Sequence, residues 1–107
     1  MRLLLLGDDE ALDLLAEFSR HLPLAELSRQ DAMPERALDE RDVVVVGGTH
    51  VRTRDALLRS VMAQGTPRHL VALVESRFAE DAGARAILVA AELVRVLLPA
   101  LLGPPAS

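Results

Sequence analysis

Three short stretches of this sequence carry residue types that could do chemistry, and each follows an apolar run. The first, Gly7-Asp8-Asp9-Glu10, sets three carboxylates in a row. Carboxylate oxygens are the ligands that Mg²⁺ prefers, so Asp8 and Asp9 are candidate metal ligands. Acidic residues also cap helix N-termini and interact favourably with the helix dipole. We favour this capping role for the first stretch.

The other two stretches are Gly47-Gly48-Thr49-His50 and Glu75-Ser76-Arg77. Flexible backbone, a hydroxyl and an imidazole at a strand end could position an anion or carry a proton. A glycine turn followed by a threonine that caps the next helix explains the second stretch more simply. In an open parallel sheet all three stretches would lie at the carboxyl ends of strands, where ligands bind.

No arrangement typical of an enzyme is present in the sequence. There is no cysteine, and the three histidines, His21, His50 and His69, are widely separated. A cysteine nucleophile, a thiolate-held iron–sulfur cluster and a paired-histidine metal site are therefore excluded. There is no G-x-S-x-G elbow, and a single glycine followed by acids does not fit a dinucleotide fingerprint. We expect no catalytic activity and no cofactor.

The charge balance argues against nucleic acid as a partner. The 12 basic residues, all of them arginine, stand against 16 acidic residues, for a formal net charge of -4. Neutralised phosphates supply most of the affinity for nucleic acids, and this chain has no basic surplus. An aromatic content of 2% also leaves no platform for stacked bases.

Apolar runs alternate along the chain with helix-period patterns. Runs of leucine and of valine mark strands at 2–6 and 42–46, buried on both faces as in a parallel sheet. Apolar residues at three- and four-residue steps predict helices over 10–21 and 54–64. Between them we expect an edge strand at 24–27 and a polar loop, with room for one helical turn, at 30–41. A further strand is predicted at 69–74.

The C-terminal segment 82–102 is open to two interpretations. It is either one long helix to about Leu98 or a helix followed by a last strand after Pro99. Its long apolar face would be a binding patch if no other element covered it. Residues 103–107 are expected to form a frayed tail.

These elements predict an α/β fold with a doubly wound, mostly parallel sheet, in the flavodoxin-like three-layer α/β/α arrangement. Residues 1–107 are expected to form a single domain. Acidic residues interrupt the first leucine run, and Glu92, Arg95 and Pro99 interrupt the last apolar segment. We therefore expect neither a secretion signal nor a membrane span. The expected location is the cytoplasm, and a peripheral position on a membrane complex stays open.

Arginines around the second predicted helix form a candidate docking surface for an acidic protein. In that part of the chain Arg52, Arg54, Arg59 and Arg68 outnumber Asp55. A solvated helix face is the commoner reason for such a run of charges. The candidate partner-binding residues combine these arginines with the strand-end stretches: Gly48, Thr49, His50, Arg52, Arg54, Arg59, Arg68, Ser76 and Arg77.

An ordered set of landmarks begins at Asp42. A strand ends in Gly48-Thr49, a helix carries Arg59 and Gln64, a Pro67-Arg68 turn follows, and the next strand covers 70–74. Further along come Val96-Leu97-Leu98-Pro99 and Gly103-Pro104-Pro105. In order and spacing these landmarks resemble the small, cluster-bearing subunit shared by respiratory complex I and [NiFe] hydrogenases. The resemblance implies an α/β fold and a large-subunit partner.

The chain departs from that family at every cluster cysteine. Gly7-Asp8-Asp9-Glu10 stands where the hydrogenase version has Cys-Asp-Ile-Glu, and Arg77 stands in place of the next cysteine. The third is missing between Gly103 and Pro104. The resemblance therefore implies a relative without an iron–sulfur cluster: a non-catalytic protein-interaction subunit of a complex I-like or hydrogenase-like assembly.

Two other resemblances imply a similar sheet. The first third of the chain resembles a response-regulator receiver domain, with Asp8 and Asp9 as its acidic pair. Gly47 stands where a receiver has its phosphoacceptor aspartate, and the chain has no lysine. The alternative function is therefore a pseudo-receiver regulatory module that self-associates through the apolar C-terminal segment. Thr49-His50 and Ser76-Arg77 are also similar to the Rossmann domain of XdhC-type molybdenum-cofactor chaperones, although that alignment needs large deletions.

Overall fold

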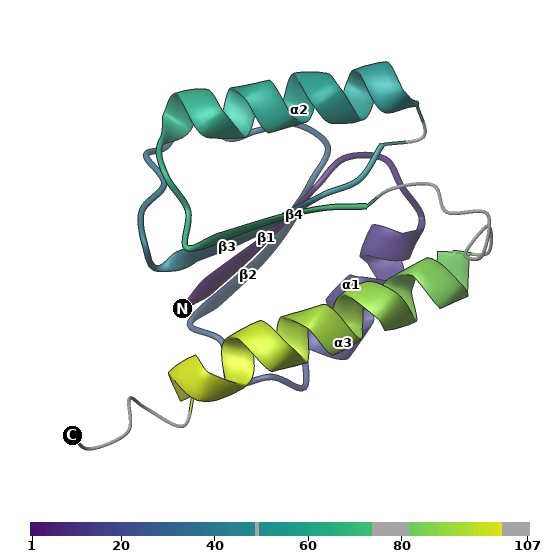
Figure 1. The fold of residues 1–107 in the computed structure, drawn as a ribbon, viewed down its shortest axis with the longest axis vertical. Coiled ribbons are helices and arrows are strands. Elements are labelled where there is room, and N and C mark those ends of the chain that lie inside the picture. The colour runs from purple at the N-terminus through teal and green to yellow at the C-terminus, as the bar shows by residue number, and fades with distance from the viewer. Residues whose placement is uncertain (49, 74–81, 102–107) are drawn as a thin grey trace.

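The structure is a computed structural model, and it describes residues 1–48, 50–73 and 82–101. Strands and helices follow one another in the order that the sequence predicts, with two consecutive strands joined by a loop (Figure 1). The elements in chain order are β1 (Arg2–Leu6), α1 (Ala11–Ser19), β2 (Glu26–Gln30), β3 (Asp42–Val46), α2 (Val51–Gln64), β4 (His69–Ala72) and α3 (Ala82–Leu101).

The four strands form one parallel sheet in the order β2-β1-β3-β4. β1 and β3 lie at its centre, with Leu3 opposite Val43 and Leu6 opposite Val46. Their consecutive apolar side chains are fully buried, because a central parallel strand has protein on both of its faces. The predicted α/β class with a parallel sheet is therefore confirmed.

Helices cover both faces of this sheet (Figure 1). Leu3, Leu5, Val43 and Val45 point to one face, where they pack with buried residues of α1 and α3. Their neighbours in sequence point to the other face and pack against Leu57 and Val61 of α2. The alternation of a strand thus divides one apolar run between two cores.

Most predicted boundaries lie within a few residues of the observed ones. The strands at 2–6 and 42–46 are confirmed, while α1 is shorter than 10–21 and α2 begins three residues before 54. The edge strand predicted at 24–27 is observed at Glu26–Gln30. Its backbone pairs with that of β1, and apart from Leu27 its residues are polar, so an apolar pattern does not reveal the strand. The strand predicted at 69–74 ends at Ala72, and Val74 lies outside the described residues.

At the C-terminal end, one of the two open interpretations is correct. α3 is a single helix that continues through Pro99 to Leu101, with no strand after the proline among its residues. Residues 103–107, predicted to fray, lie outside the described part of the chain. Within the described ranges, no helix combines the length and the hydropathy needed to cross a bilayer.

A loop takes the place of a helix between β2 and β3. Leu38 of this connection is buried and pairs with Gly65, the residue at the C-terminal end of α2. Gly65 has a φ of 143°, and a Cβ there would lie 2.3 Å from the carbonyl oxygen of Leu38. The glycine predicted to end the helix is therefore also required for the loop to pack beside it.

A buried carboxylate fixes the amino edge of the sheet. Asp42 is fully buried, and its carboxylate accepts hydrogen bonds from Arg2 at 3.0 Å and from Arg36 at 3.2 Å. The backbone N–H of Asp39 donates a third, at 3.0 Å. The pKa of Asp39 itself is lowered, chiefly because the backbone N–H of Arg41 donates to its carboxylate. We call Arg2, Arg36 and Asp42 the amino-edge clasp, since they join β1, β3 and the loop.

Candidate functional site

The crevice between the carboxyl ends of β1 and β3 is where a sheet of this order would bind a ligand. Gly7 follows β1 with a φ of 120°, and a Cβ on it would lie 1.6 Å from the carbonyl oxygen of Gly47. Gly47 in turn extends the sheet by donating its N–H to Leu6 at 2.9 Å. Both glycines are thus needed because the two turns touch each other.

Protein side chains also fill the space beside Gly47. A Cβ on Gly47 would meet the side chain of Leu73 at 2.8 Å and Cβ of Asp9 at 3.0 Å. Leu73 and Asp9 are both buried. The described side chains therefore pack closely around the turn at Gly47.

The first acidic stretch serves the helix that follows it. The carboxylate of Asp9 accepts a hydrogen bond from the backbone N–H of Ala11 at 3.0 Å, which caps the start of α1. Asp8, the other candidate metal ligand, is exposed. Among the described residues no group of three or more histidine, aspartate or glutamate side chains comes together as a metal site would require.

An arginine of β2 makes contacts at the same carboxyl ends of the strands. Arg29 donates to the carbonyl oxygen of Gly7 at 2.6 Å and pairs with Asp13 of α1 at 3.2 Å. These contacts join the ends of β1 and β2 to the first helix. Sequence reasoning did not single out Arg29, because it lies in a polar stretch whose strand character is set by pairing alone.

The predicted partner-binding residues do not form one patch. His50 and Arg52 are exposed at the start of α2, and Gly48 is half-buried just before them. Arg68 is exposed just before β4 begins, near the amino ends of the strands. Its backbone N–H donates to the backbone carbonyl oxygen of Asp42 at 2.8 Å. The remaining residues of that surface, Thr49, Ser76 and Arg77, lie outside the described part of the chain.

Arg54 differs from the other arginines of α2 because its side chain is mostly buried. Its guanidinium lies 3.5 Å from the carbonyl oxygen of Leu73 and 3.6 Å from the carboxylate of Asp55. It thereby joins the start of α2 to the end of β4. The guanidinium group of Arg54 therefore makes its contacts within the fold.

The outer ridge of α2 is basic and exposed. Arg52 and Arg59 are seven residues apart, which places them on the same side of the helix, opposite the buried Leu57 and Val61. Met62, 70% exposed, lies one turn beyond Arg59 on that side. α2 carries three arginines and one aspartate, while the whole chain has a net charge of -4. Arg54 is mostly buried and Asp55 is exposed, so the exposed charges of α2 are two arginines against one aspartate, a net of +1.

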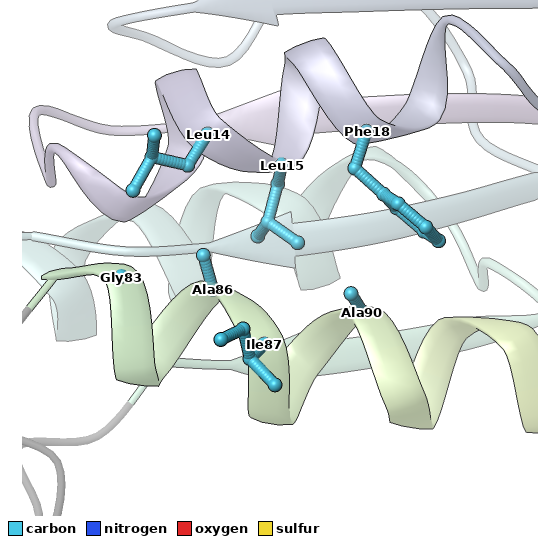
Figure 2. A pocket seen from close by; sticks show the side chains of 7 residues that line it. All are labelled: Leu14, Leu15, Phe18, Gly83, Ala86, Ile87 and Ala90. Atoms are coloured by element: carbon cyan, nitrogen blue, oxygen red, sulfur yellow. The ribbon is translucent and has the colours of Figure 1, made fainter.

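An apolar groove lies between α1 and α3, on the other side of the sheet from α2. It has a volume of about 260 Å³. Figure 2 shows side chains from α1 directed at α3, and small residues of α3 opposite them. Its lining residues are Leu14, Leu15, Phe18, Gly83, Ala86, Ile87 and Ala90.

The sequence indicated only one of the two helices that line the groove. The apolar face of 82–102 marked a binding patch if uncovered, and Ile87 of that segment is indeed exposed. Phe18, however, shares the apolar face predicted for the first helix, yet it is 37% exposed. Leu14 and Phe18 together could have indicated this exposure. They make the apolar face of the first helix wider than the part that the sheet can cover.

One ion pair lies on α3, on the side of the helix turned away from the residues that line the groove. Arg95 donates to Glu92 through Nε at 3.1 Å, and a second bond joins Nη2 to the other carboxylate oxygen. These bonds lower the pKa of Glu92 and raise the pKa of Arg95. Both side chains are exposed enough to exchange this partner for another at little cost.

The fold and these surfaces define the chain as a small α/β domain with a parallel sheet, whose two helical faces differ in chemistry. Comparison with protein-family models, with curated proteins and with solved structures gives no match.

Proposed function

We propose that this chain is a non-catalytic protein-interaction domain that binds an acidic protein surface through the outer ridge of α2. The observation that supports this proposal is the exposed pair Arg52 and Arg59 on a chain that is otherwise acidic. Complementary charge raises the rate of encounter and selects the partner.

The proposed partner is the large subunit of a complex I-like or hydrogenase-like assembly. This part of the proposal rests on the ordered landmarks from Asp42 onward and on the loss of every cluster cysteine. The domain would keep the docking role of a small subunit and lack its electron transfer. A cytoplasmic location, peripheral to a membrane complex, belongs to the same proposal.

The test is a tagged pull-down at low salt from cells that express the protein, with the captured subunits identified by mass spectrometry. We expect a complex I-like or hydrogenase-like large subunit, released by Arg52→Glu with Arg59→Glu. The matched control, Arg20→Glu with Arg41→Glu, makes the same change in net charge at exposed positions away from α2. Equal release by both double variants, or no such subunit with the unaltered protein, would refute the proposal.

The alternative is a pseudo-receiver regulatory module. The strand order β2-β1-β3-β4 agrees with the first four strands of the flavodoxin-like order 2-1-3-4-5. Gly47 stands at the phosphoacceptor position, and the space where its side chain would begin is filled by Leu73 and Asp9. Under this alternative the pull-down captures a kinase or a transcription factor, and acetyl phosphate leaves the mass of the protein unchanged.

A further inference from the structure

A polar pocket lies at the amino ends of the strands, at the edge of the sheet away from the crevice. Its volume is about 340 Å³, and its lining residues are Met1, Glu40, Arg41 and Arg68. Three of them, Met1, Arg41 and Arg68, stand directly before β1, β3 and β4. Parallel strands begin at the same edge of a sheet, so the topology brings these residues together. We call this cavity the amino-edge pocket.

Backbone hydrogen bonds fix the starting points of its two arginines. The N–H of Arg2 donates to the carbonyl oxygen of Arg41 at 2.7 Å, and the N–H of Arg68 donates to that of Asp42 at 2.8 Å. Neighbouring strands of a sheet lie about 4.8 Å apart. Since Arg41 and Arg68 begin on neighbouring strands and line one pocket, both guanidinium groups are within reach of one small molecule.

These two arginines differ from those of the amino-edge clasp beside them. Arg2 and Arg36 donate to the buried carboxylate of Asp42. Arg41 and Arg68 are exposed, and neither guanidinium group has an ion pair or a hydrogen bond with any residue that the structure describes. The lining thus holds two arginines and one glutamate on a chain whose net charge is -4. A cleft with a surplus of positive charge concentrates anions.

We propose that the amino-edge pocket binds a small organic phosphate, a phosphate monoester of a sugar or another polyol. Such a phosphate carries about -1.5 to -2 charges at pH 7 and three acceptor oxygens, enough for both guanidinium groups. A carboxylate has two oxygens, which match the fork of a single arginine. Glu40 accepts a hydrogen bond from a hydroxyl group of the ester. The volume lies at the lower end of the about 300–1,000 Å³ of typical ligand sites, which suits a small ligand.

This proposal goes beyond the protein-interaction function and does not depend on it. Arg52 and Arg59 of the outer ridge of α2 do not line the pocket. Purified protein tests the pocket alone. The pull-down control, Arg20→Glu with Arg41→Glu, removes one arginine of the pocket and should still capture the large subunit. Each proposal can therefore fail without the other.

Isothermal titration calorimetry of the purified full chain with ribose 5-phosphate is the test. We expect saturable binding at low salt with a dissociation constant below about 1 mM. Arg41→Gln and Arg68→Gln should each weaken binding at least tenfold, because each removes one guanidinium group. Arg20→Gln is the matched control, since it makes the same change in net charge at an exposed arginine that does not line the pocket. Circular dichroism verifies that each variant is folded.

A comparison with inorganic phosphate tests the contact with the hydroxyl group. The unaltered protein should bind ribose 5-phosphate more tightly than inorganic phosphate. Glu40→Ala should bring the two affinities together, because loss of the negative charge affects both ligands and loss of the hydroxyl contact affects only the ester.

Four results would overturn the proposal. The first is the absence of saturable binding at millimolar ribose 5-phosphate. The second is equal weakening by Arg20→Gln, which would mean that the overall charge attracts the ligand and no pocket holds it. The third is tighter binding of succinate than of ribose 5-phosphate, since the pocket would then select carboxylates. The fourth is an unchanged ratio of the two phosphate affinities in Glu40→Ala.

Discussion

The amino-edge clasp offers a direct test of how this fold is held together. Asp42→Ala removes the carboxylate that two arginines and the N–H of Asp39 share. Removing one partner of a buried ion pair costs about 3–5 kcal/mol. Arg2 and Arg36 keep 28% and 27% of their side-chain surface exposed, so water can reach both of them after the change. We therefore expect the lower value, about 3 kcal/mol, of a total stability of about 5–15 kcal/mol.

The measurement is urea unfolding followed by far-ultraviolet circular dichroism. The chain has neither tryptophan nor tyrosine, so intrinsic fluorescence is not a usable probe. The midpoint should fall without a change in slope, because the surface exposed on unfolding stays the same. Glu92→Gln is the control, since it breaks an exposed pair on α3 and should cost less than about 1 kcal/mol. A loss below about 1 kcal/mol for Asp42→Ala would refute the reasoning.

A triple variant separates the loss of charge pairing from the loss of packing. Asp42→Leu alone leaves Arg36 without its carboxylate and Arg2 with only the exposed Asp39, which lies 3.3 Å away. Asp42→Leu with Arg2→Met and Arg36→Met removes the whole buried charge cluster, and the charge of Asp39 that remains is exposed. Apolar replacement of a whole buried charge cluster is often neutral or stabilising. The triple variant should therefore recover most of the stability lost in the single one. If it is less stable than Asp42→Leu alone, the clasp acts through something other than its charges.

Three further predictions concern single positions. Gly7→Ala should cost at least about 2 kcal/mol in urea unfolding, since its φ is positive and its Cβ would meet the carbonyl oxygen of Gly47. Leu93→Ala should lower the free energy of unfolding by about 2–5 kcal/mol, because the side chain of Leu93 in α3 is fully buried. Asp39 has a folded-state pKa below its ordinary value of 3.8, chiefly through the N–H of Arg41. Its contribution to stability is present above about pH 4 and lost as pH falls through the folded pKa, so Asp39→Asn should flatten the acid limb of the stability profile.

The central sheet could be predicted from the sequence because its signal is local. Leu3 to Leu6 and Val43 to Val46 are runs whose every side chain is apolar, and only a strand covered on both faces uses such a run. The glycine after α2 was also readable, since helices commonly end at a glycine and glycine readily adopts a positive φ such as the 143° of Gly65. These features depend on neighbours in sequence, and the structure bears them out.

The contacts that decide the surfaces depend on residues far apart in the chain. β2 is a strand because it pairs with β1, and its Ser28, Arg29 and Gln30 carry no strand pattern of their own. Arg54 shares the helical spacing of the buried Leu57 and Val61, whereas Arg59 does not, but the contact of Arg54 with the carbonyl oxygen of Leu73 is seen only in the structure. The exposure of Phe18 follows from how far α3 reaches across α1. The spacing of Leu14 and Phe18 indicates a wide apolar face, but not which of its residues α3 leaves exposed.

The position of β1 at the centre of the sheet has a consequence for synthesis on the ribosome. The strand that needs two neighbours is the first to be made, and one of its faces is covered by Leu93 of α3, which is made near the end. At about 5–20 residues per second, Leu93 is made roughly 2–10 s after β3. During that time α3 does not cover the leucine and valine side chains of that face. Slower translation between β3 and α3 would lengthen this interval. It would therefore raise the demand for chaperones without any change in the protein that results.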